Sequence, residues 1–304
     1  MKKFLILNLI LILALSLSSC RRSVPFKYVE GKVNVVATTT MIGDLLSEIG
    51  KEHVSVTTVM NVGVDPHSFI PRPSVTRAIS KADLVVTNGL NLEAKLGKVL
   101  HVLDDKLLEL GSFVPEESLI KDENGEIDPH FWFDVNLWTI AAEALTNRLI
   151  LMDEENELDY LNNFNKYKEK LILLDEYIKE EVLLIEEEKR VLITAHDAFS
   201  YFGKAYGFNV LSIQGISTES EASAKDIKDL ANLIVDNNVK AIYLESSIPE
   251  TTIKSLIDAV KVMGHNVIIG GTLYSDSLGE EGSGAENYLD MVRHNIDTII
   301  GGLK

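Results

Sequence analysis

The apolar residues downstream of residue 32 alternate between two kinds of pattern. Short β-branched runs predict strands, and amphipathic stretches with apolar residues every three or four positions predict helices. The predicted strands are 33–39, 54–60, 84–88, 191–195, 210–213, 241–244 and 267–269, and the predicted helices are 41–50, 74–82, 136–152, 226–235, 251–263 and 285–300. Because strand and helix alternate in two blocks, the chain is expected to be an α/β protein with two lobes and largely parallel sheets.

A different pattern separates the two blocks. Residues 154–189 contain neither Gly nor Pro, and their apolar residues form one stripe at helical spacing: Leu161, Phe164, Tyr167, Leu171, Leu174, Ile178, Val182 and Ile185. A helix of about 35 residues would be roughly 50 Å long and could span both lobes. Two helices with an unmarked break are the alternative. We therefore predict an N-terminal lobe at 32–153, a linking helix at 154–189 and a C-terminal lobe at 190–304.

The N-terminus has the features of an export signal. Lys2 and Lys3 precede an apolar run over residues 4–17. This run is shorter than the roughly 20 residues that a membrane-spanning helix needs, and it is typical of a secretory signal. It ends in Leu-Ser-Ser-Cys, which resembles a bacterial lipobox with Cys20 as the lipid-modified residue. We predict a signal peptide at 1–19 and a lipidated tether at 20–31; an ordinary signal followed by a chance cysteine is the alternative.

Composition narrows the classes of partner. The formal net charge is −17, and it becomes more negative when Lys2 and Lys3 are removed with the signal. Such a charge disfavours nucleic acid, whose binding depends on phosphate neutralisation, and it attracts cations. Cys20 is the only cysteine, so neither a disulfide framework nor a thiolate metal site is available. We expect a protein outside the cytoplasm, anchored to a bacterial membrane on the periplasmic side or at the cell surface.

Candidate ligands for a metal ion occur in four separate segments. His67 and His130 each close an Asp-Pro-His triplet, in which the proline restricts the backbone and so helps to orient the histidine. His196 closes a predicted strand, and Asp276 follows the last one. Sheets of α/β proteins bind ligands at the carboxyl ends of their strands. The alternatives are structural histidines and, for Asp276, a helix N-cap.

Five ordered blocks carry a resemblance to a known family. They are GVDPH at 63–67 with KADLVVTNGL at 81–90, DPHFW at 128–132, TAHDAF at 194–199, ESS at 245–247 and YSD at 274–276. Together they resemble the metal-binding lipoproteins that serve ABC importers of manganese, zinc or iron, the cluster A-I solute-binding proteins, and especially the TroA-like branch. The resemblance implies two α/β lobes joined by one long rigid helix, with the metal buried between the lobes.

The resemblance also implies a ligand set. His67 and His130 would come from the first lobe, and His196 and Asp276 from the second. Manganese members generally use a Glu in the third role, and Glu219 lies at what looks like that position, so it is an additional or alternative ligand. Imidazole and carboxylate without thiolate suit Zn²⁺, Mn²⁺ or Fe²⁺ and argue against Cu(I). These residues leave open which metal is physiological.

The resulting hypothesis is a binding protein without catalytic activity. We expect a monomer that binds one divalent transition metal ion as cargo and delivers it to the permease subunits of an ABC importer. One alternative is an extracytoplasmic zinc hydrolase, which would need an open coordination position; the sequence has no HExxH motif. Another is a surface adhesin with an incidental metal. Three histidine ligands further predict that metal affinity weakens steeply between about pH 6 and 5, with a loss that approaches the third power of proton concentration.

Overall fold

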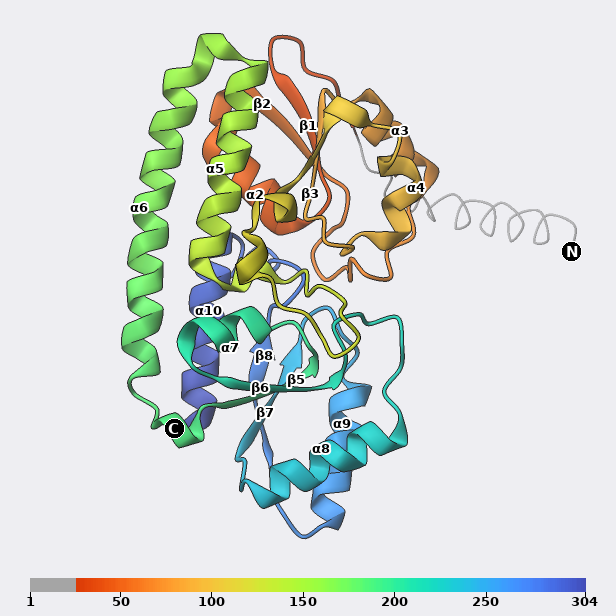
Figure 1. The fold of residues 1–304 in the computed structure, drawn as a ribbon, viewed down its shortest axis with the longest axis vertical. Helices are drawn as coiled ribbons and strands as arrows, with labels where there is room; N and C mark the ends of the chain where they lie inside the picture. Colours follow the sequence, from red (N-terminus) through yellow and green to blue (C-terminus); the bar gives the residue numbers. More distant parts are fainter. Residues whose placement is uncertain (1–25) are drawn as a thin grey trace, which may run out of the picture.

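Two α/β lobes lie one above the other along the long axis of the molecule, and a long helix runs beside both (Figure 1). The computed structural model describes residues 26–304. The predicted signal peptide, Cys20 and the first part of the predicted tether lie outside the described residues. The fold class expected from the sequence is confirmed, since every strand pair within a lobe is parallel.

The N-terminal lobe contains one four-stranded sheet. Its order is β2-β1-β3-β4, with bounds β1 Val33–Ala37, β2 Val54–Thr58, β3 Leu84–Thr87 and β4 Leu107–Glu109. Helices cover both faces: Val35 and Ala37 belong to the core that contains α2 (Thr40–Gly50), whereas Val36 packs with α3 (Pro73–Lys81). Because both faces are covered, every residue of β1 is buried, including Asn34, the one polar residue within this strand. The short α4 (Gly97–Leu100) precedes β4.

The C-terminal lobe repeats this layered arrangement. Strand β5 (Val191–His196) pairs with β6 (Asn209–Gln214), β7 (Ala241–Glu245) pairs with β8 (Ile268–Leu273), and β5 lies beside β7. Ile193 and Ala195 face a core formed with α8 (Ala224–Asp236) and α9 (Thr251–Val262). Leu192 faces the opposite core, which includes α7 (Ser200–Tyr206) and α10 (Tyr288–Leu303).

The linking helix is present but shorter than predicted. Helix α6 covers Glu157–Val182, which is 26 residues or about 39 Å. It begins after a 3₁₀ turn at Glu154–Asn156. Beyond Val182 the amides of Leu183, Leu184 and Ile185 bond to carbonyls three residues back, so the helix tightens and ends there. The helix packs against α5 (Val135–Met152), α2 and α10, and so it contacts both lobes. The long helix expected from the sequence is confirmed, and its buried stripe is the predicted one from Phe164 onward, with Tyr160 buried in place of Leu161.

Within residues 26–304, no helix combines the length and the apolar character needed to cross a membrane.

Candidate metal centre

The four predicted ligand residues reach one point between the lobes from four separate segments. His67 lies in the loop between β2 and α3, and His130 immediately precedes the 3₁₀ turn Phe131–Phe133 that leads into α5. His196 is the last residue of β5, and Asp276 lies three residues beyond β8. Asp276 is not a helix N-cap, because Asn287 caps α10. The carboxyl ends of the strands thus face each other across the lobe boundary, where α/β sheets bind ligands.

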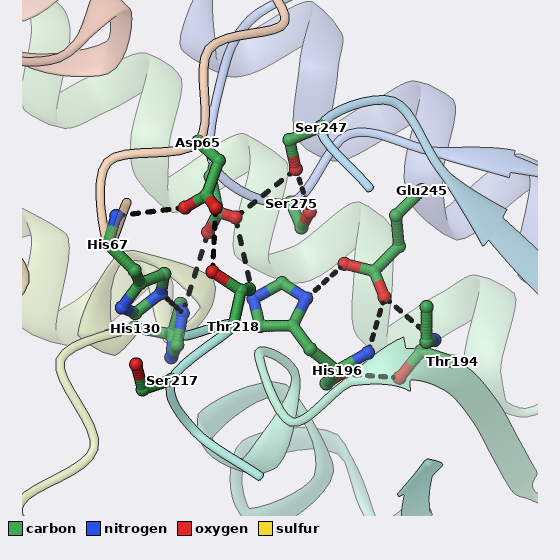
Figure 2. Close-up of polar contacts among 12 residues, drawn as sticks. Asp65, His67, His130, Thr194, His196, Ser217, Thr218, Glu245, Ser247 and Ser275 are labelled. Carbon is green, nitrogen blue, oxygen red and sulfur yellow. Dashed lines mark hydrogen bonds and ion pairs between the residues drawn. The ribbon is translucent and has the colours of Figure 1, made fainter. Parts of the chain in front are cut away.

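Their side chains are buried and close together. One nitrogen or oxygen atom from each of His67, His130, His196 and Asp276 lies within 4.8 Å of the others. His67 Nε2 is 3.3 Å from His130 Nε2, and the Nε2 atoms of His130 and His196 lie 3.5 and 3.4 Å from the Asp276 carboxylate. Figure 2 shows the three imidazoles turned toward one another. This is the spacing expected of atoms that share one small cation.

Two of these inward-facing atoms lack a hydrogen-bond partner. His196 Nε2 and Asp276 Oδ1 are buried, and no group within residues 26–304 completes their hydrogen bonding. Leaving buried polar atoms unpaired costs free energy. A divalent cation between the four side chains would satisfy both atoms, so the donor set fits a metal ion.

Carboxylates behind two of the histidines orient their rings. Asp128 Oδ1 accepts hydrogen bonds from both the backbone amide and Nδ1 of His130, at 2.9 and 2.7 Å. Glu245 Oε1 accepts the amides of Ala195 and His196, at 2.8 and 2.9 Å, while its Oε2 lies 2.6 Å from His196 Nδ1 as a charged contact outside ideal hydrogen-bond geometry (Figure 2). Both carboxylates favour a proton on Nδ1, which leaves Nε2 free to bind an ion.

His67 is held differently. Asp65 Oδ1 accepts only the backbone amide of His67, at 2.8 Å. The other Asp65 oxygen accepts the hydroxyls of Ser68 and of Thr218, which belongs to the C-terminal lobe, at 2.8 and 2.6 Å. Asp65 therefore positions the loop that carries His67, and it ties that loop to the opposite lobe, without contacting the imidazole.

These surroundings separate the pKa values of the three histidines. Burial, together with the neighbouring His130 and His196, lowers the pKa of His67 to about 4, against the opposing effect of Asp276. Burial also acts to lower the pKa of His130, but Asp128 and Asp276 outweigh it and raise this pKa to about 9. Glu245 and Asp276 likewise outweigh burial and raise the pKa of His196 well above its ordinary value.

The pKa of the carboxylate in the site is shifted downward. Burial acts to raise the pKa of Asp276, but His196 and His130 outweigh it and hold this pKa well below its ordinary value. Without metal at neutral pH, the site therefore contains one neutral imidazole, two imidazolium rings and one carboxylate. An entering cation must displace the protons from His130 and His196.

Glu219 lies outside this group. Its side chain is exposed and forms an ion pair with Lys95 of the opposite lobe. It lines a cavity of about 440 Å³ that also touches His67 and Ser217. The structure thus brings His196, and not Glu219, together with the other three predicted ligands.

Glu245 has a role that the motif analysis did not assign. The residue was noted only as part of a matching block. The signal available in the sequence is its place directly after the predicted strand 241–244; its pairing with His196 depends on strand order, since β7 lies beside β5 in the structure. An acidic residue at the carboxyl end of a strand adjacent to a metal-binding histidine is a candidate for its carboxylate partner.

Comparisons with known proteins agree with this geometry. The family described as "Zinc-uptake complex component A periplasmic" matches residues 35–302. The manganese-binding lipoprotein MntA of Bacillus subtilis is 37% identical over 298 residues, which cover 97% of each chain. The solved structure of the periplasmic zinc-binding protein TroA of Treponema pallidum has a TM-score of 0.88 at 40% identity, covering 90% of this chain and 99% of that one.

A further solved structure is the Fe(III)-bound YtgA of Chlamydia trachomatis, with a TM-score of 0.82 at 26% identity, covering 90% of this chain and 98% of that one. The matches extend over nearly all of the described residues and include every segment that contributes to the site. This protein therefore belongs to the zinc-uptake component A family, the cluster A-I metal-binding solute-binding proteins whose sequence blocks it carries.

Proposed function

We propose that this protein captures a divalent transition metal ion outside the cytoplasm and delivers it to an ABC-type importer. The observation that carries the proposal is the buried group of His67, His130, His196 and Asp276 between the two lobes, which we propose as the ligands. The relatives named above are a manganese-binding lipoprotein, 37% identical over 97% of this chain, and a zinc-binding protein, 40% identical over 90% of this chain. The names of these relatives describe binding proteins, and they give no support to the hydrolase or adhesin alternatives.

The ligand set accommodates several ions. Three imidazoles and a carboxylate suit Zn²⁺, Mn²⁺ and Fe²⁺, and affinity along the first-row series is expected to be at least as high for zinc as for manganese. A structural neighbour was solved with Fe(III). The imported ion in the cell then depends on metal supply and on the permease. We further propose that the protein acts as a monomer, and that residues 32–153 and 190–304 form two bodies joined by the segment 154–189.

The test of this proposal is the metal content of the protein. Stripped and reloaded protein is expected to hold one Zn²⁺ or Mn²⁺ per chain by elemental analysis, because the described residues bring four candidate ligand atoms to a single point. Binding should also raise the melting temperature, since a ligand at about 1,000 times its Kd stabilises the folded state by about 4 kcal/mol. A content of two ions per chain, or of none, contradicts the single-site proposal.

The lipid anchor is proposed from the sequence and is tested separately. Cys20→Ser is expected to abolish lipid modification and to move the protein from the membrane to the soluble fraction, because the thiol of Cys20 is the proposed attachment site. Incorporation of a labelled fatty acid into the wild type and the variant measures this. Labelling of the variant equal to that of the wild type would show that lipid is attached elsewhere, and an unlabelled wild type would show that the anchor is absent.

Glu245→Gln tests the role of the carboxylate behind His196. The amide oxygen can still accept the backbone amides of Ala195 and His196, but the negative charge that favours the metal-binding tautomer is lost. Zn²⁺ affinity measured by chelator competition is expected to fall by about 10-fold to 100-fold. Glu219→Gln is the matched control, because it neutralises an exposed carboxylate outside the group. An equal loss in both variants would show that the effect is one of general charge.

A further inference from the structure

Trp132 connects the two lobes next to the metal centre. Its indole is buried, with 1% of the residue exposed. The indole Nε1 donates a hydrogen bond to the carbonyl of Ser275, at 3.2 Å, and the carbonyl of Trp132 accepts one from the hydroxyl of Tyr288, at 2.7 Å. Trp132 lies in the turn that leads into α5, whereas Ser275 and Tyr288 belong to the C-terminal lobe. One residue is therefore bonded to the opposite lobe through both its side chain and its backbone.

The two residues joined by the hydrogen bond from the indole Nε1 to the Ser275 carbonyl both lie next to proposed ligands. Trp132 follows His130 by two residues, and its ring meets the imidazole edge-on with centroids 5.1 Å apart. At the other end, Ser275 immediately precedes Asp276. The bond thus joins the loop that carries His130 to the loop that carries Asp276, two ligands that come from different lobes. A shift of either loop would change the separation between His130 Nε2 and the Asp276 carboxylate, which is 3.5 Å here.

Other hydrogen bonds between the lobes also reach the ligand-bearing loops. The amide of Gly63, in the loop that carries the first ligand, donates to the hydroxyl of Ser277 in a partly buried setting. The carbonyl of Asp128 accepts the buried hydroxyl of Tyr201 from α7. Trp132 differs from these residues because its side chain and its carbonyl both bond across the lobe boundary, and both bonds are buried, where breaking them leaves acceptors without water.

We propose that Trp132 is a positioning residue that holds the His130 loop against the Asp276 loop and thereby sets the rate at which the bound ion leaves. This inference rests on the proposed metal-binding function. An ion held by ligands from two lobes is released when the lobes separate, and separation must break the bond from Trp132 to Ser275. An interaction that is present when the lobes are closed and lost when they open stabilises the closed state. It therefore makes opening less frequent and slows dissociation of the ion. It also pre-organises the ligands, which reduces the ordering cost of binding.

The two tryptophans of the chain provide a matched comparison. Trp138 is equally buried, and its Nε1 donates to the hydroxyl of Tyr167 at 3.1 Å. That bond joins α5 to α6 and touches no ligand-bearing loop. Trp132→Phe and Trp138→Phe therefore each remove one buried indole N–H, but only the first removes a bond across the lobe boundary. Tyr288→Phe is a third variant, which keeps the ring that stacks on Trp138 and removes only the hydroxyl bonded to Trp132.

The experiment measures the dissociation rate of Zn²⁺ from each full-length mature protein by mixing with excess chelator, and the melting temperature without metal. Trp132→Phe and Tyr288→Phe are expected to raise the rate about tenfold, the scale of one lost buried hydrogen bond. Trp138→Phe is expected to change the rate less than about twofold, although it lowers the melting temperature as well. If Trp132→Phe fails to fold, Tyr288→Phe carries the test.

Intrinsic fluorescence adds a readout that a purely structural role would not change. In Trp138→Phe, Trp132 is the sole tryptophan, and its emission should respond to Zn²⁺; in Trp132→Phe, the remaining emission should respond little. Equal dissociation rates for Trp132→Phe, Tyr288→Phe and Trp138→Phe would overturn the inference while leaving the proposed function intact. Failure of the wild type to bind Zn²⁺ would instead overturn the proposed function, and this inference with it.

Discussion

His196→Ala is expected to weaken Zn²⁺ binding by roughly 10²-fold to 10³-fold, because four ligands share a binding free energy on the order of 10–16 kcal/mol. The variant removes the inward-facing Nε2, which lies 3.4 Å from the Asp276 carboxylate. It also leaves Glu245 buried without the imidazole that it contacts at 2.6 Å. Isothermal titration with Zn²⁺ and Mn²⁺, together with chelator competition for tight binding, measures the loss.

Glu219→Ala is the decisive comparison for this result. Sequence reasoning left His196 and Glu219 both available as the third ligand. In the structure Glu219 is exposed and paired with Lys95, so its removal should change Zn²⁺ affinity little, with any loss greater for Mn²⁺, which favours oxygen ligands. Equal losses in the two variants, or a larger loss in Glu219→Ala, would show that the third ligand was assigned wrongly.

Destabilisation of the apoprotein is a separate effect and has its own control. His196→Gln keeps much of the side-chain volume while it replaces the imidazole, so its melting temperature should stay nearer that of the wild type. If His196→Gln loses Zn²⁺ affinity as His196→Ala does, the loss reflects the missing ligand and not a collapsed strand end.

The fold could be read from the sequence because its signals are local. β1 and β3 are mainly apolar, as expected of strands covered on both faces, and the predicted helices that correspond to α2, α3, α5, α8, α9 and α10 have apolar residues at helical spacing. The missed elements include β4, with three residues and only one buried side chain, and α4, with four residues; both are too short for a period to emerge. Helix α6 ends at Val182 although the apolar stripe continues to Ile185, because the backbone there has changed to 3₁₀-type bonds, which the side-chain pattern does not reveal.

The contacts within the site could be predicted only in part from the sequence, for a different physical reason. The Asp-Pro-His triplets of His67 and His130 are alike in sequence, yet Asp128 bonds the ring of His130 whereas Asp65 bonds only the backbone of its histidine. That difference depends on ring rotation and on Thr218 from the other lobe, and neither is encoded in the local pattern. The pairing of Glu245 with His196 likewise depends on strand order, which brings β7 beside β5.

These differences between the histidines change the expected pH dependence of binding. Sequence alone predicts competition from three protons between about pH 6 and 5, since an unperturbed imidazole has a pKa near 6.5. In the structure, burial lowers the pKa of His67 to about 4, so this ring is already neutral above about pH 5. His130, with a pKa raised to about 9, and His196, with a pKa raised well above its ordinary value, still carry protons at neutral pH.

The direction of this pH dependence is set by the protonation state of the imidazole that binds the ion. A metal ion binds the neutral imidazole, so a raised pKa means that protons compete up to a higher pH, and affinity increases as pH rises. Between about pH 5 and 8, we expect competition from two protons, which corresponds to roughly a hundredfold increase in Zn²⁺ affinity per pH unit. Near pH 9 the slope should decrease as His130 loses its proton, and below about pH 5 it should steepen as His67 begins to be protonated.

The slope is obtained from the Zn²⁺ affinity across this pH range, corrected for the protonation of the competing chelator. Calorimetry in buffers of different ionisation enthalpy gives the number of protons released. The wild type and Glu219→Ala should each release about two protons per Zn²⁺ at pH 7, and His196→Ala about one. A third-power slope in the wild type would show that His67 is hydrated before metal arrives, and therefore that the metal-free lobes stand open. A flat slope would exclude imidazoles as the main ligands. If His196→Ala keeps the wild-type slope, His196 does not bind the ion, and Glu245 must serve some purpose other than orienting it.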